Sequence, residues 1–268
     1  MIDTILDQLW RVYTEQNPQV KAVYDAFASR GEQVVNDHIA FRTFDLPEIN
    51  ISRLASVFQR NGYEMQGEYL FPEKKLYARH YEHANPKYPK VFISQLELDS
   101  FSDKFQKIIR ETVAKIDINA LLSDEFIYSG VLWDKISFQT YNELRKESEY
   151  AAWLYANGFV ANHFTVSINH LKTFPKGIRE VNAFLKEKGF LMNANPNEIQ
   201  GSAEKLLEQS SIKAGIQTKE FIEGSFEIPG AYYEFAQRYR DAEGKLFESF
   251  IADSANKIFE STDFYAQS

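Results

Sequence analysis

The sequence NDHIAFR at residues 36–42 returns in a similar form, ANHFTVS, at residues 161–167. Each stretch has a histidine at its third position, His38 in the first and His163 in the second. The alternation of residue types, with many β-branched and aromatic side chains, is typical of a β-strand. A recurrence of this kind predicts two copies of one structural unit.

The residues downstream of each histidine repeat in the same order. Helical periodicity follows at residues 49–60 in the first copy and at residues 176–188 in the second. Gly62 and Gly189 then end the two helices, at nearly the same separation from their histidines. Chance similarity between two strands would not produce this shared register.

The copies also share a closing strand. Its sequence is YPKVFIS at residues 88–94 and IPGAYYE at residues 228–234. This alignment places Glu234 of the second copy where the first copy has Ser94. A carboxylate is therefore expected in one half of the molecule only.

The first copy predicts a β-α-β-β-β unit, and two such units predict an α+β fold. Duplicated units of this type commonly pair into a curved, cup-shaped mixed sheet, with side chains of the first and last strands converging inside the cup. We expect a single domain over residues 1–268, with pseudo-repeats at residues 34–98 and 161–240. The strands predicted for the first copy are residues 34–44, 62–70, 76–82 and 90–98.

Three regions lie outside the repeated strands and helices. Residues 1–30 have helical periodicity and predict an N-terminal helical cap. Residues 101–158 predict a helical insert between the two copies. Residues 195–211, rich in Glu, Lys and Gln, are interpreted as a loop and a short helix on the surface.

Composition limits the classes of function. The 268 residues are 44% hydrophobic and 15% aromatic, enough for a large core. The formal net charge of -8 disfavours nucleic acid as a partner, because an acidic protein repels phosphate backbones. No apolar stretch is long enough for a bilayer, so no membrane association is expected.

The chain contains no cysteine, which excludes disulfides, thiolate nucleophiles and cysteine-type zinc sites. The first ten residues lack the basic start and apolar run of a secretory signal. We therefore expect a cytoplasmic protein, in which any metal ion is held by histidine and carboxylate.

Two imidazoles and one carboxylate form the facial triad that non-haem Fe(II) enzymes use. We predict that His38, His163 and Glu234 bind one divalent metal ion. This ligand set leaves positions open for a chelating substrate and O₂. Fe(II) is the first choice, although the same ligands also suit Zn, Mn or Ni.

Arg42 is the predicted substrate-binding and catalytic residue beside the metal. Residues two and four apart in a strand share a face, so Arg42 lies on the face of His38, as Arg238 lies on that of Glu234. A guanidinium binds a carboxylate through two parallel hydrogen bonds. This favours a 2-oxo or dicarboxylic acid as the small-molecule substrate.

The layout of these motifs resembles the vicinal oxygen chelate superfamily. The strings at residues 36–44, 161–166 and 228–238 resemble more closely the 2-oxoadipate dioxygenase/decarboxylase family, long known only as a domain of unknown function. The similarity runs from the N-terminal helices to about Arg240. Many members of that family are considerably longer than this chain.

The resemblance implies that the substrate is 2-oxoadipate and that Fe(II) and O₂ take part. The products would be CO₂ and 2-hydroxyglutarate, which suggests a place in lysine catabolism. Matched position by position, the ligands would be His38, His163 and Glu234, and the substrate-binding arginine would be Arg42.

Structural alternatives exist for each of these residues. A histidine in a strand is often a core residue, Glu234 can pair with Arg238, and Arg42 can pair with Asp37 or Glu97. The three other histidines are expected in supporting or solvent-exposed roles: His80, His83 and His170.

Two other classes of function also fit the residues. One is a glyoxalase-like lyase, isomerase or hydrolase that uses a redox-inert metal as a Lewis acid. The other is a binding module that sequesters a small acid without turnover. The sequence lacks a nucleophile elbow, a Walker loop and a dinucleotide fingerprint, and it gives no oligomeric state.

Overall fold

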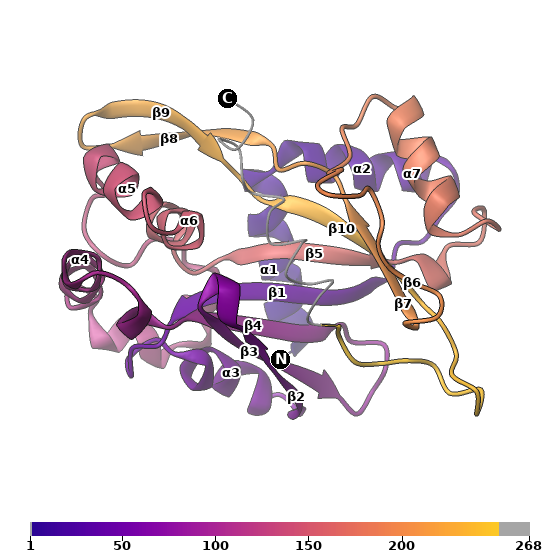
Figure 1. Ribbon diagram of the computed structural model, residues 1–268, viewed down its shortest axis with the longest axis horizontal. Helices are drawn as coiled ribbons and strands as arrows, with labels where there is room; N and C mark the ends of the chain where they lie inside the picture. Colours follow the sequence, from indigo (N-terminus) through magenta and orange to yellow (C-terminus); the bar gives the residue numbers. More distant parts are fainter. Residues whose placement is uncertain (1, 252–268) are drawn as a thin grey trace.

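The computed structural model describes residues 2–251, which contain one eight-stranded sheet in the order β2-β3-β4-β1-β5-β10-β7-β6 and a separate two-stranded ribbon, β8-β9 (Figure 1). The sheet is mixed and curved, and helices accompany it, which confirms the predicted α+β class. Its strands are β1 (Asn36–Phe44), β2 (Tyr63–Phe71), β3 (Leu76–His83), β4 (Lys90–Leu96), β5 (Ala161–Ser167), β6 (Gln200–Ser202), β7 (Leu207–Ser211) and β10 (Tyr232–Arg238), and the ribbon is β8 (Ile216–Phe221) with β9 (Gly224–Pro229).

Each half of the sheet is built in the same way. In the first half β1 pairs in parallel with β4, and in the second half β5 pairs in parallel with β10. The next strands outward, β3 and β7, are antiparallel to β4 and β10. The ribbon β8-β9 is an addition to the second half, because it interrupts the connection from β7 to β10.

The halves meet where β1 and β5 run side by side as antiparallel neighbours. Ala40 lies opposite His163, and the register shifts at two points along this pair. The two strands that carry the predicted histidine ligands are therefore adjacent at the centre of the sheet.

Helices cover one face of the sheet. Trp10 and Tyr13 of α1 contact the ring of Phe164 in β5, while Phe58 of α3 contacts Phe41 in β1. Helix α7 packs on β7 and β10. The helices on this face are α1 (Ile2–Gln16), α2 (Pro18–Ser29), α3 (Ile51–Gln59) and α7 (Ile178–Glu187).

The insert between the halves is helical and gathers at one end of the sheet (Figure 1). Its last helix contacts β1 and ends at Gly158, whose φ of 66° suits glycine. The insert helices are α4 (Asp103–Val113), α5 (Phe138–Arg145) and α6 (Glu149–Asn157). Short 3₁₀ helices lie at Pro72–Lys74, Leu98–Ser100, Ile118–Leu122, Asp124–Tyr128 and Ile168–His170.

The prediction for residues 195–211 was wrong. This stretch contains β6 and β7 instead of a surface helix, and every residue of β7 is buried. Its polar side chains are tolerated in the interior because each has a partner: Glu208 binds Arg179, and Ser210 donates to Asn182. Because the stretch is polar, the sequence did not indicate that it contains a buried strand.

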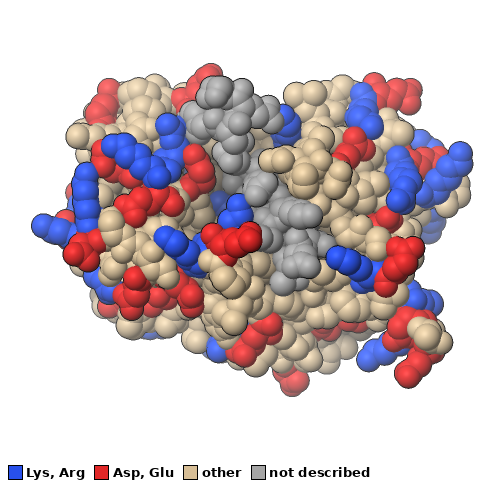
Figure 2. Space-filling model, in the orientation of Figure 1, with Lys and Arg blue, Asp and Glu red and all other residues tan. Residues whose placement is uncertain are grey.

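The described residues include no helix that is long and apolar enough to cross a bilayer. On the face shown in Figure 2, basic and acidic side chains are interspersed. The described side chains on that face form no continuous basic surface of the kind that binds a polyanion.

Candidate metal centre

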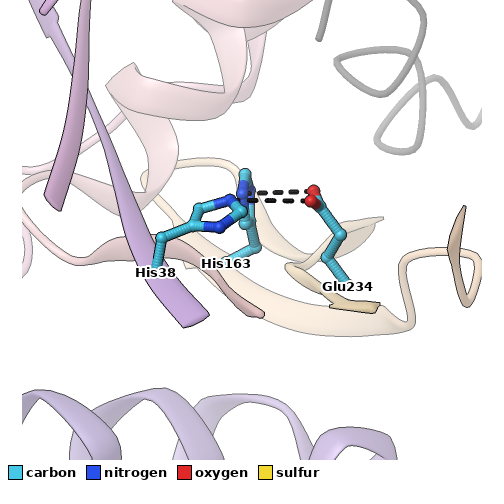
Figure 3. A group of neighbouring side chains, drawn as sticks. All are labelled: His38, His163 and Glu234. Carbon is cyan, nitrogen blue, oxygen red and sulfur yellow. Dashed lines mark ion pairs between the residues drawn. The ribbon is translucent and has the colours of Figure 1, made fainter. Parts of the chain in front are cut away.

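The three predicted ligands converge on the face of the sheet opposite α1. His38 comes from β1, His163 from β5 and Glu234 from β10, which are consecutive strands in the sheet (Figure 3). The distance from His38 Nε2 to Glu234 Oε1 is 3.5 Å, and that from His163 Nε2 to Glu234 Oε2 is 3.3 Å. All three side chains are buried.

The spacing of these atoms fits a common ion. One ligand atom from each residue lies within 4.8 Å of the others. Metal–nitrogen and metal–oxygen bonds of about 2.1 Å place neighbouring ligand atoms about 3 to 3.5 Å apart. Between residues 2 and 251 this is the one group of three or more His, Asp or Glu side chains with such spacing.

The residue before each histidine fixes its ring. His38 Nδ1 lies 2.8 Å from Asp37 Oδ1, and His163 Nδ1 lies 3.2 Å from Asn162 Oδ1. These contacts favour a proton on Nδ1 and leave Nε2 of each ring to face Glu234. Partners of this kind orient metal-binding histidines in many proteins.

Asp37 is itself held by Arg238, at the end of β10. The guanidinium binds both carboxylate oxygens, at 2.7 and 2.8 Å. Burial alone would raise the pKa of Asp37, but the charge of Arg238 and the hydrogen bonds from His38 and Arg238 outweigh it and lower that pKa. Asp37 is therefore a permanent negative charge behind His38, and Arg238 does not pair with Glu234.

Glu234 is in a different electrostatic position. Burial raises its pKa to about 8, although Gln209 of β7 donates a hydrogen bond of 2.6 Å to Oε1. Burial lowers the pKa of His38 and of His163. Without an ion these three side chains are uncharged near neutral pH, so a metal ion must displace the proton of Glu234.

Arg42 lies on the same side of the sheet as the three ligands. Its side chain is buried, with the guanidinium 4.8 Å from the ring centre of Tyr150 and 5.0 Å from that of Trp153. After burial and the charge of His38, the charge of Arg42 also lowers the pKa of His163. Asp37, suggested as a partner for Arg42, binds Arg238 instead.

A segment after β10 returns to this centre. Arg238 Nη1 donates to the carbonyl oxygens of Phe247 and Ser249, at 3.1 and 2.7 Å. The ring of Phe250, buried and edge-on, lies 4.9 Å from that of His38. Phe250 thus shields His38 from water.

The remaining histidines lie outside the group of three. His80 is buried between Tyr69 and Glu82, at 2.8 and 3.1 Å. His83 accepts a hydrogen bond from the backbone of Asn85, and His170 contacts Ser167.

The sequence interpretation overlooked the support of the ligands. The roles of Asp37 and Asn162 could have been predicted, because each residue directly precedes a histidine of the repeat. Gln209 was missed because its strand was not predicted, and the contact of Arg238 with Asp37 joins residues far apart in sequence.

The proposed match of Ser94 with Glu234 is shifted by two residues. His38 pairs with Lys90 in β4, and His163 pairs with Tyr232 in β10. The counterpart of Glu234, two residues further on, is therefore Phe92. Both alignments keep the same strand face, which explains why the sequence comparison could not separate them.

The fold and the site together define a duplicated, curved sheet that holds two imidazoles and a carboxylate on its inner strands, in a site suited to a divalent metal ion. A glyoxalase superfamily protein of Ralstonia eutropha shares this fold, with a TM-score of 0.73 and 20% identity over 91% of this chain and 83% of its own. Residues 4–245 match the family described as 2-oxoadipate dioxygenase/decarboxylase. The chain belongs to this family of enzymes.

Individual relatives agree. The chloroplastic 2-oxoadipate dioxygenase/decarboxylase of Arabidopsis thaliana is 34% identical, over 97% of this chain and 76% of the relative. The crystal structure of hydroxyglutarate synthase from Oryza sativa, in complex with 2-oxoadipate, has a TM-score of 0.89 and 31% identity, covering 97% of this chain and 91% of its own. A Shewanella frigidimarina protein with the general name of hydrolase has a TM-score of 0.89 and 45% identity, covering 94% and 98%.

Proposed function

We propose that this protein is a metal-dependent dioxygenase and decarboxylase of 2-oxo dicarboxylic acids, with 2-oxoadipate as substrate. One molecule each of 2-oxoadipate and O₂ would give one molecule each of 2-hydroxyglutarate and CO₂, a balanced reaction that needs no external reductant. The metal ion would be Fe(II), held by His38, His163 and Glu234.

The observation that carries this proposal is the buried group of two histidines and one glutamate, in a chain of the 2-oxoadipate dioxygenase/decarboxylase family. When bound, Fe(II) supplies open coordination positions for the acid and O₂ and the redox chemistry between them. The rice relative was crystallised with 2-oxoadipate, which supports a small 2-oxo acid as the ligand.

The side chains of this chain have separate roles in the proposal. Asp37 and Asn162 orient the two imidazoles. Arg42 supplies a buried positive charge for a substrate carboxylate, which would otherwise lose its hydration without compensation. Phe250 keeps water away from one side of His38.

The test begins with metal analysis of protein purified without oxygen. An oxygen electrode and a CO₂ assay then follow the reaction of Fe(II)-loaded protein with 2-oxoadipate and with shorter and longer 2-oxo dicarboxylic acids. We expect O₂ uptake and CO₂ release in a one-to-one ratio with one of these acids.

Two results would contradict the proposal. If iron-loaded protein consumes no O₂ with any of these acids, the dioxygenase assignment fails. If product forms equally well without O₂ and with Zn, Mn or Ni, the protein is a glyoxalase-like lyase, isomerase or hydrolase that uses the ion as a Lewis acid.

A further inference from the structure

Tyr232 lies beside the metal centre, at the start of β10. It precedes Glu234 by two residues, so both side chains point to the same face of the sheet. Its ring is fully buried and lies 4.7 Å from the ring of His163, at 30°. Tyr232 therefore forms part of the wall next to a predicted ligand.

The hydroxyl of Tyr232 is buried and makes no hydrogen bond to any residue in the described range, 2–251. Burying an unsatisfied hydroxyl destabilises a folded protein, and phenylalanine would fill the same space without this penalty. An unsatisfied hydroxyl at a ligand site indicates a hydrogen-bond partner that arrives with the ligand.

The charges around Tyr232 indicate which kind of partner. A phenol hydroxyl carries its proton at neutral pH and can donate a hydrogen bond. The Tyr232 side chain lies on the sheet face that carries Glu234 and Arg42, near enough for the charges of both to act on it.

The metal ion and Arg42 would bind opposite ends of a 2-oxo dicarboxylic acid. Chelation would use the 2-oxo oxygen and the adjacent carboxylate, which leaves the distal carboxylate without a partner at the metal. A buried carboxylate needs both a counter-charge and hydrogen-bond donors. The Arg42 guanidinium supplies the charge and the Tyr232 hydroxyl a further donor.

We propose that the Tyr232 hydroxyl donates a hydrogen bond to the distal carboxylate of the substrate, in one subsite with Arg42. Tyr232 thereby selects 2-oxo dicarboxylic acids over 2-oxo monocarboxylic acids of the same length. This inference rests on the proposed function, because it assumes that a 2-oxo acid binds at the metal.

The experiment compares two tyrosines that are neighbours in the chain. Tyr232→Phe removes the hydroxyl in the site, and Tyr233→Phe is the matched control. Tyr233 is also buried and its hydroxyl also has no hydrogen bond within residues 2–251, but its ring faces Trp10 and Tyr13 on the opposite side of the sheet. Calorimetry measures the Kd of 2-oxoadipate and of 2-oxohexanoate with zinc-loaded protein, in which no oxygen chemistry follows.

We expect Tyr232→Phe to weaken binding of 2-oxoadipate by roughly tenfold or more, the effect of losing a hydrogen bond to a charged group. Binding of 2-oxohexanoate and of zinc should change by less than about twofold, well under the size of one hydrogen bond. Tyr233→Phe should leave all three Kd values unchanged.

Other outcomes would overturn the inference. An unchanged Kd for 2-oxoadipate would mean that Tyr232 acts only as an aromatic wall. Equal weakening for both acids would place the contact at the chelated end and remove the selectivity. If the unaltered zinc-loaded protein binds neither acid, the proposed function fails first, which separates the two results.

Discussion

The two halves of the sheet share a strand plan but differ in what their strands carry. Each begins with a histidine on its first strand, His38 on β1 and His163 on β5. On the last strand, the second half has Glu234 where the register of the first half gives Phe92. Neither half alone holds three ligands, so the candidate metal centre exists only where the halves meet.

The residues that orient the two histidine ligands also differ between the halves. Asp37 brings a negative charge that Arg238 balances, while its counterpart Asn162 is a neutral amide. At the position of Phe92, the first half packs an aromatic ring against Phe250 instead of binding an ion. The duplicated backbone therefore places one histidine from each half, and the residues that differ between the halves, Glu234 and Asp37, complete the site.

The largest expected effect comes from removing a ligand of the second half. His163→Ala or Glu234→Ala should abolish stoichiometric metal binding and reduce turnover by more than about a thousandfold, because the ion supplies several kcal/mol of stabilisation. Metal analysis and the oxygen electrode measure both quantities. His170→Ala, on an exposed histidine near the end of β5, is the control; if it has the same effect, the assignment of ligands is wrong.

The next test replaces the charged partner of His38 by a neutral amide, the kind of partner that His163 has. Asp37→Asn should weaken metal binding about 10- to 100-fold, the usual effect of losing an outer partner of a histidine ligand. It also leaves the Arg238 charge without its buried counter-ion, so the free energy of unfolding should fall. Asn162→Ala should weaken metal binding by only about threefold, because no charge is lost. Equal effects of the two variants would contradict a difference between the halves.

A third test concerns the one ligand that has no counterpart in the first half. Because the pKa of Glu234 is raised to about 8, an ion must displace a proton below that pH. Metal affinity should therefore be constant above about pH 8 and fall about tenfold per pH unit below it. Calorimetry in buffers of different ionisation enthalpy should detect one proton released at pH 7. A Kd that does not change between pH 6 and 8 would contradict a protonated Glu234.

The smallest effect is expected at Ser94, which the sequence comparison aligned with Glu234. Its hydroxyl contacts Tyr150 and the carbonyl of Phe41 and lies outside the group of three ligands. Ser94→Ala should lower the free energy of unfolding by about 1 kcal/mol and leave metal affinity unchanged. A loss of metal binding would instead support the sequence alignment, in which Ser94 rather than Phe92 is the counterpart of Glu234.

The sequence was sufficient for much of this arrangement. The repeated histidine, the helix after it and the glycine that ends the helix are local patterns, and they predicted the duplicated sheet. Together with the closing strands, they also predicted the convergence of His38, His163 and Glu234. The supporting contacts were not predictable in this way. Gln209 belongs to a strand whose polar residues are satisfied only by distant partners, and no periodicity reveals such a strand.

The role of Tyr232 was hidden for a related reason. In the sequence it is one of two adjacent tyrosines, and nothing local shows which faces the site. The structure separates them, because one ring lies on His163 and the other on the aromatic cluster of α1.

Arg238 gives the polypeptide after β10 an influence on His38. The same guanidinium holds Asp37 and the carbonyl oxygens of Phe247 and Ser249. A protease cut at the exposed turn around Gly244 would loosen those carbonyls and, through Asp37, the imidazole. Nicked protein should release its ion to a chelator sooner than intact protein while its circular dichroism spectrum stays the same, so proteolytic damage would first be noticed as a loss of bound metal.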